Sequence, residues 1–347
     1  MTHASGKPHR VLAALSLFLL SPLIGEWLLG NQPVTELPAV LVLAPLYGGG
    51  AVLVRETARR AGRGWPTMVL LAAAYALVEE GPVDQMLWNS HYSGVDMGGA
   101  YAATRVPLLG TSVAMVQDVL AVHTIWSICV PIALVEAFTR DRTRPWLKRP
   151  GLALTGVVFV GGSLLLALVQ VHSEQFVASP AQFALCGSVI VALIAVALAL
   201  PRRRPASGGE DAPVPRPLLL GAGAFASTSL YMARDLVPGG FADWAGVGYW
   251  CVAAVAGPAL VLRWSRRTGW GARHRLALAG GALLTYVWAG FAQARTLDIP
   301  HRTALLGNVL FGTAALLLLA AAVHTVRRRE RAGTEGHPQG SLQYAQR

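Results

Sequence analysis

Charged residues are scarce in this chain of 347 residues. Only 14% of its residues are charged, whereas 54% are hydrophobic and the mean hydropathy is +0.47. About a quarter of the residues of a typical soluble domain are charged, so the shortage excludes an ordinary soluble protein and predicts a polytopic membrane protein. Lysine is limited to Lys7 and Lys148, while Arg and Ala are abundant. That bias is typical of a GC-rich genome and predicts a bacterial cell membrane as the location.

Cysteine is equally rare. Cys129, Cys186 and Cys251 lie in three different apolar runs, far from a second Cys or a His at ligand spacing. The pattern argues against disulfides and against a zinc site built on thiolates.

Acidic residues are outnumbered by basic ones, which gives a formal net charge of +11. The basic residues form short clusters between apolar runs, the arrangement that orients membrane spans. We therefore expect these basic residues to face the surface of the lipid bilayer and not to bind nucleic acid.

Long apolar runs dominate the rest of the chain, and each can cover about 30 Å of hydrocarbon at about 1.5 Å per helical residue. They predict an all-α transmembrane bundle of ten spans. The first follows a basic N-terminus but lacks a small-x-small cleavage site after it, so we expect an uncleaved span. The runs cover residues 11–29, 37–54, 66–87, 112–138, 151–171, 180–200, 217–235, 244–263, 275–294 and 303–325.

The positions of the basic residues predict the orientation. With a cytoplasmic N-terminus and ten spans, all of the 29 Lys and Arg residues fall on the inside except Arg105, Arg234, Arg295 and Arg302. Because cytoplasmic loops are enriched in Lys and Arg, both termini are predicted to be cytoplasmic.

Composition also suggests a division of the chain. We expect an N-terminal membrane domain over 1–200, a Pro/Arg-rich cytoplasmic linker over 201–217, a C-terminal membrane domain over 218–330 and a disordered tail over 331–347. The outside segment 88–111, rich in Gly, Tyr and polar residues, is a candidate lid.

Two adjacent acids, Glu79 and Glu80, lie inside the third predicted span. A carboxylate at such depth is costly unless it is protonated, paired or beside water, so it marks a functional site by default. By helical rise the pair lies about 12 Å below the outer boundary, and His123 of the fourth span lies about 16 Å below it. These similar depths predict that the three side chains meet.

Other polar residues fall in the same outer half. Glu26 and Asp118 could join the pocket, although Asp118 is about 140° around the helix from His123. Ser127 shares the face of His123. The expected rim is formed by Asp84, Gln85 and Asn89.

Some polar and helix-breaking residues have simpler interpretations. Glu136 lies near the inner surface and is expected to meet the basic cluster at 140–149. The glycines that follow Tyr47, at 48–50, predict close helix packing, with an unwound segment as the alternative. Kinks are expected at the prolines inside spans, Pro22, Pro45, Pro82, Pro131 and Pro258.

The acids and His123 are compatible with several kinds of chemistry. They could activate water for hydrolysis, carry a proton for a transporter or hold a divalent ion. The alternative without chemistry is a hydrogen-bonded network that only joins the helices.

The Glu79-Glu80 pair followed by His123 on the next span resembles the CAAX-prenyl-protease and bacteriocin-processing family of intramembrane glutamate-dependent proteases. That family has Glu-Glu-x-x-x-Arg and Phe-x-x-x-His motifs; here Gly81-Pro82-Val83-Asp84 lacks the arginine and Val119 replaces the phenylalanine. The chain also resembles uncharacterised bacterial multi-span proteins with a GEWLLGN-like end to the first span, a YGGG-x-x-x-x-RE segment and an H-x-I-W-S helix.

We therefore expect an intramembrane hydrolase with an outward-facing polar pocket. Glu79 or Glu80 would be the general base, and His123 would polarise the carbonyl of a membrane-embedded peptide or lipid or hold a metal. A proton- or ion-coupled transporter using the same acids is the second hypothesis, and a non-catalytic scaffold is the third. The sequence does not identify a cofactor, a metal or an oligomeric state.

Overall fold

The protein is built almost entirely from helices. The computed structural model describes residues 7–92, 102–140, 142–202, 212–236 and 240–335. Its α-helices are α1 (Lys7–Pro22), α2 (Val40–Arg60), α3 (Trp65–Val78), α5 (Val113–Ala121), α6 (Val130–Phe138), α7 (Arg149–Glu174), α8 (Pro180–Ala199), α9 (Pro217–Ala233), α10 (Gly240–Ser265), α11 (Ala272–Thr296) and α12 (His301–Glu335). Shorter elements are the π-helical turns η1 (Leu23–Leu28), η3 (Glu79–Val83) and η5 (Val122–Cys129), and the 3₁₀ turns η2 (Val34–Ala39) and η6 (Arg234–Leu236).

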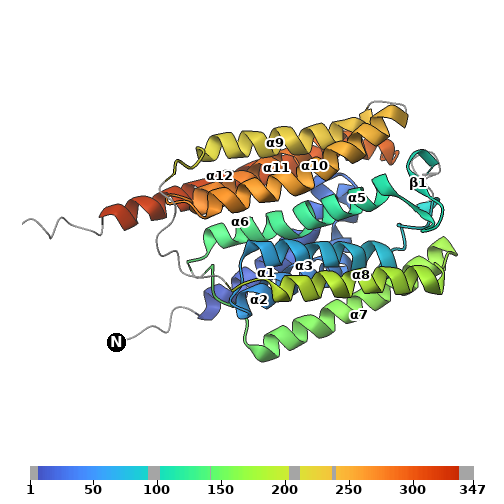
Figure 1. Ribbon diagram of the computed structural model, residues 1–347, viewed down its shortest axis with the longest axis horizontal. Coiled ribbons are helices and arrows are strands. Elements are labelled where there is room, and N and C mark those ends of the chain that lie inside the picture. Colours follow the sequence, from blue (N-terminus) through green and yellow to red (C-terminus); the bar gives the residue numbers. More distant parts are fainter. Residues whose placement is uncertain (1–6, 93–101, 141, 203–211, 237–239, 336–347) are drawn as a thin grey trace, which may run out of the picture.

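The helices run roughly parallel to one long axis and form layers. In Figure 1, α9 to α12 lie on one side, α7 and α8 lie on the opposite side, and α1 to α3 with α5 and α6 lie between them. The described start of α1 and the described end of α12 are at the same end of the bundle. The opposite end carries a small antiparallel hairpin of β1 (Arg105–Val106) and β2 (Thr111–Ser112), which the sequence did not predict.

Three buried apolar clusters lie among the described residues, and two of them are large. One lies among α1, α2, α3 and α6 and includes the buried side chains Leu17, Met68 and Ile132. The other joins the first half of the chain to the second, because Trp126 and Leu134 pack with residues of α11 and α12. The indole of Trp126 stacks on Tyr286 with ring centroids 4.4 Å apart and donates to the Ala282 carbonyl at 2.7 Å.

The apolar length of the helices supports a membrane protein. Eight helical stretches of the described residues are long and apolar enough to cross a bilayer: His9–Leu28, Val34–Arg60, Val113–Phe138, Arg149–Glu174, Pro180–Ala199, Asp243–Ser265, Ala272–Thr296 and His301–Ala332. The remaining two predicted spans are helical as well. The segment α3–η3 contains the acid pair, which lowers its apolar character, and α9 has only 17 residues. The count of ten spans stays a prediction.

Parts of the predicted division fall outside the described residues. These are residues 203–211 of the linker, 93–101 of the candidate lid and 336–347 of the tail. The division into two membrane domains stays a prediction.

Close packing at the three glycines after Tyr47 is confirmed, since α2 continues as an α-helix through them. A Cβ atom on Gly48 would lie 1.9 Å from the Phe18 carbonyl oxygen of α1, and one on Gly50 would lie 2.3 Å from the Tyr75 ring of α3. Pro22, four residues after Phe18, has no N–H to occupy that carbonyl. The glycine therefore lets α2 approach α1 at the carbonyl that the proline leaves without its helical partner.

A buried ion-pair network lies at the Arg-rich end of the bundle, which we define as the end where α2 and α6 finish and α3 and α11 begin. Glu136 accepts hydrogen bonds from Arg55 at 3.1 Å and from Arg59 at 2.7 to 3.1 Å. The expectation that Glu136 meets the cluster at 140–149 is thus wrong. The loop between α6 and α7, which contains this cluster, is bound by Arg55 instead. Its guanidinium donates hydrogen bonds to the backbone carbonyls of Arg142 and Arg144.

Substitution of Gly48 by alanine is expected to destabilise the bundle. The added Cβ would meet a backbone oxygen that cannot rotate away, and overpacking of this kind costs about 1–3 kcal/mol. Thermal unfolding in detergent measures the effect. Gly161→Ala on α7 is the control, because a Cβ there meets nothing within 4 Å. Equal unfolding midpoints for the two variants would contradict the proposed contact.

Candidate functional site

Five of the residues predicted for the site lie on three π-helical turns. Glu26 is in η1, Glu79 and Glu80 begin η3, and His123 and Ser127 are in η5. A π-helical turn inserts an extra residue into a helix, and such turns are frequent at functional sites.

Each of these turns has a proline beside or inside it: Pro22 directly before η1, Pro82 within η3, and Pro131 shortly after η5. Proline has no N–H, and its ring clashes with the carbonyl four residues earlier, so the helix cannot keep its regular ladder there. The prolines thus account for the places where the helices widen.

The carbonyl that Pro131 deprives of its helical partner is that of Ser127. Ser21 of α1 donates its hydroxyl to this oxygen at 2.5 Å, and the same hydroxyl lies 3.1 Å from the Tyr47 carbonyl of α2. Because buried backbone groups need partners, this serine fixes the irregular turn against two neighbouring helices. The turn that carries His123 is therefore held in position.

At the centre of the site, the His123 imidazole lies between two carboxylates. Its Nε2 atom is 2.7 Å from Glu80 Oε1, and its Nδ1 atom is 2.8 Å from Glu79 Oε2. The Nδ1 atom is also 3.2 Å from the Ser127 hydroxyl. Both ring nitrogens are thus engaged, and each faces a different acid of the same helical turn.

The three side chains are enclosed by protein. Glu79 is 0%, Glu80 5% and His123 6% exposed. Within the described part of the chain, Glu80 Oε2 has no hydrogen-bond donor, and the contact of Glu79 with the imidazole is close but lacks hydrogen-bond geometry. The acids therefore keep acceptor capacity that the surrounding side chains do not use.

Glu26 joins the site through Tyr47, which the sequence analysis did not include. The Tyr47 hydroxyl donates to Glu26 Oε1 at 2.5 Å, and its ring centroid is 6.0 Å from that of His123. Tyr75 packs edge-on against Tyr47, with ring centroids 6.5 Å apart. The depth of Tyr47, about 15 Å by helical rise from the start of its predicted span, is nearly that of His123 and could have identified it.

Asp118 lies on a different face of the fourth predicted span. It accepts hydrogen bonds from the Tyr231 hydroxyl of α9 at 2.5 Å and from Arg234. The structure thus does not bring Asp118 to His123, because their separation of five positions turns the two side chains to different neighbours. Its place in the pocket was predicted incorrectly.

The expected rim residues close the end of η3 against the α7–α8 connection. Asp84 accepts a hydrogen bond from Tyr92, the Gln85 side chain accepts one from the Ala178 N–H at 2.7 Å, and Asn89 donates to Glu174 at 3.1 Å. Burial and the Asp84 carboxylate raise the pKa of Tyr92 well above its ordinary value, so its phenol remains a neutral donor.

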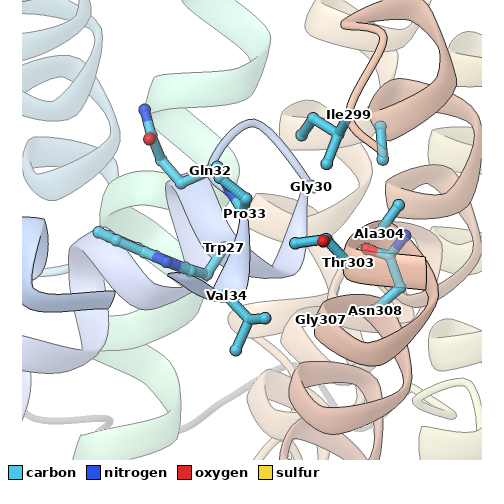
Figure 2. Close-up of a pocket in the computed structure, with 11 residues that line it drawn as sticks. Trp27, Gly30, Gln32, Pro33, Val34, Ile299, Thr303, Ala304, Gly307 and Asn308 are labelled. Atoms are coloured by element: carbon cyan, nitrogen blue, oxygen red, sulfur yellow. The ribbon is translucent and has the colours of Figure 1, made fainter. Parts of the chain in front are cut away.

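Two small cavities of the described structure lie away from His123. One of about 10 Å³ is formed where η1 meets η2 and α12, and in Figure 2 the Trp27 indole extends away from Asn308 there. Another, of about 20 Å³, lies at the Arg-rich end. Neither cavity is lined by Glu79, Glu80 or His123.

The donor set does not favour a metal ion. Among the described residues, no group of three His, Cys, Asp or Glu side chains is arranged to hold one. A metal at His123 would have to displace a carboxylate from one of the two ring nitrogens.

One of the comparisons with known proteins supports a membrane protein. No curated protein and no solved structure matches the sequence. A family model described as "Uncharacterized membrane protein family" matches residues 15–328, a range that includes every residue of the candidate site. The chain therefore belongs to this family of membrane proteins.

Proposed function

We propose that the protein is a proton-coupled transporter in which Glu79, Glu80 and His123 bind the coupling proton. The observation that carries the proposal is the imidazole held between two buried carboxylates, at 2.7 and 2.8 Å. Buried acids and histidines of this kind form the proton relays of pumps and transporters.

The charge of the trio supports proton binding. With both carboxylates ionised and the imidazole protonated, one negative charge remains, and an uncompensated charge is costly in a low-dielectric interior. A second proton removes that charge. Because the groups lie in direct contact, they would take up and release protons as one coupled unit.

Neighbouring groups provide routes for that proton. Glu26 and Tyr47 extend the polar cluster on one side. On the other side Asp84 follows Glu80 by about one turn, and Tyr92 links it to Gln170 of α7 through hydrogen bonds of 3.1 and 2.5 Å. Both groups belong to the predicted outer half, which supports proton entry from the outside.

The three π-helical turns support the conformational part of the proposal. A transporter must change shape between proton-bound and proton-free states, and irregular turns interrupt the rigid helical ladder. Since the acids and His123 lie on these turns, a change in their charge would act directly on the segments that are easiest to rearrange.

Two observations support a membrane topology with both termini on one side. The arginines cluster between alternate apolar runs, and the start of α1 lies at the same end of the bundle as the end of α12. We propose ten spans in a bacterial cell membrane, with both termini in the cytoplasm.

A second candidate function is hydrolysis. The sequence placed hydrolysis first in another form, with Glu79 or Glu80 as the general base. One observation favours a serine-dependent form: Ser127, His123 and Glu80 follow one another at 3.2 and 2.7 Å, the order of a serine–histidine–acid triad. A serine nucleophile must be reachable by a substrate, and Ser127 is buried. Its hydroxyl packs so closely on Gly25 that a Cβ atom added there would lie only 2.9 Å from it.

Replacing Glu80 by glutamine is expected to remove a titrating carboxyl group from the interior. Wild-type protein in liposomes should show a carboxylic-acid infrared band that changes between mildly acidic and alkaline pH, and Glu80→Gln should lose this change. Glu36→Gln is the matched control, because Glu36 is exposed on η2. Identical difference spectra for wild type and Glu80→Gln would argue against proton binding at the trio.

Proton movement itself gives the corresponding functional prediction. Liposomes with an internal pH-sensitive dye should dissipate an imposed pH gradient faster with wild-type protein than without it. We expect the rate of dissipation with Glu80→Gln to equal the protein-free rate, because this variant lacks the central acid of the relay. The rate with Glu36→Gln should match that of wild type.

Covalent labelling separates the two candidate functions. A fluorophosphonate probe labels an activated serine nucleophile, and the transporter proposal expects no label on Ser127 because this hydroxyl is packed and serves as a helix contact. Labelling that is abolished in Ser127→Ala and in His123→Ala would instead establish the hydrolase.

A further inference from the structure

The Arg-rich end of the bundle contains a second polar feature, the cavity of about 20 Å³. It lies where the start of α3, α6, the start of α11 and α12 approach one another. Its polar lining comes from Trp65, Glu136, Arg142 and Arg275, and the apolar lining residues are Ala133, Ala137, Ala272, Leu276 and Val326.

The charge of this cavity is positive. Glu136 is its acidic lining residue, and it already accepts hydrogen bonds from Arg55 and Arg59. The neighbouring acid Glu56 is likewise held by Arg55 at 2.6 Å. No acidic side chain of the described residues is paired with Arg142. The cavity therefore presents the guanidinium of Arg142, whose charge no acid of the described residues balances.

One residue that lines the cavity, Trp65, carries a donor without an acceptor in the described structure. The indole nitrogen of Trp65 is buried and has no hydrogen-bond partner among the described residues. A buried indole N–H usually finds such a partner, because leaving it without one is costly. Trp65 is the first residue of α3, and the first turn of this helix contains no acidic side chain. A ligand here should thus be anionic and rich in acceptor oxygens.

We propose that this cavity binds the phosphate group of an anionic phospholipid. A volume of about 20 Å³ admits one or two oxygen atoms, since one water-sized probe needs about 10–15 Å³. The phosphate oxygens would enter, while the rest of the head group stays outside and the acyl chains stay in the bilayer. Basic pockets between transmembrane helices bind lipid head groups in this way.

Such a lipid would connect the two parts of the chain. Trp65 and Glu136 belong to the helices before the predicted linker, whereas Arg275 and Val326 belong to α11 and α12 after it. A bound phosphate between them would hold α3 and α6 against α11, independently of the trio at His123.

Native mass spectrometry of the detergent-purified protein, titrated with phosphatidylglycerol or phosphatidylcholine, tests the proposal. We expect the first phosphatidylglycerol to bind with higher affinity than phosphatidylcholine. Arg142→Gln should weaken that binding about fivefold, the effect of losing one basic contact to an anionic lipid. Arg144→Gln is the matched control, because Arg144 lies in the same loop, is exposed and does not line the cavity.

Trp65→Phe provides a second variant in case Arg142→Gln fails to fold. It removes the indole N–H and keeps an aromatic ring, and it should also weaken phosphatidylglycerol binding. Equal losses in Arg142→Gln and Arg144→Gln would mean diffuse surface attraction and would overturn the proposal, as would equal binding of the two lipids. If inorganic phosphate displaces phosphatidylglycerol at a similar concentration, the ligand is a soluble phosphate and the lipid assignment is wrong.

Discussion

The contact of one imidazole with two carboxylates is the interaction on which the arrangement of the central helices depends. Glu79 and Glu80 are adjacent in sequence, so a regular helix would point them about 100° apart, and His123 must lie between these directions to meet both. The fourth predicted span carries His123 to that position on the widened turn η5. Ser21 then secures the widened turn by binding its displaced carbonyl, and Gly48 allows α2 to close the space on the other side. Packing and polar contacts are therefore arranged around the same point.

The membrane class and the positions of most helices could be predicted from the sequence because apolar length and the spacing of arginines are local properties. Glu79, Glu80 and His123 could be brought together by depth alone, since helical rise converts residue number into height. Depth does not tell which way a side chain faces. This explains the error at Asp118, which turns toward Tyr231 and Arg234, and the error at Glu136, whose partners are arginines of α2. It also explains why Tyr47 was missed: its depth matches that of His123, but depth gives no indication that its hydroxyl meets Glu26.

The two polar regions of the bundle differ in their charge balance. Around His123 the acids exceed the bases and their lone pairs are incompletely used. At the Arg-rich end the bases exceed the acids, and each acid of the network is already held by an arginine. A carboxylate excess takes up protons or cations, whereas a guanidinium excess attracts anions. The same apolar bundle thus contains two polar regions of opposite charge balance, separated along its long axis.

The widened turn at η5 also bears on how such a site can arise and be lost. A π-helical turn is equivalent to one residue inserted into an α-helix, so removing one residue there would rotate everything on one side by about 100° relative to the other. His123 would leave Glu79 and Glu80, while the apolar character and length of the span would hardly change. Within this family, a single-codon deletion could therefore separate members with the histidine contact from members without it, although their hydropathy profiles would look the same.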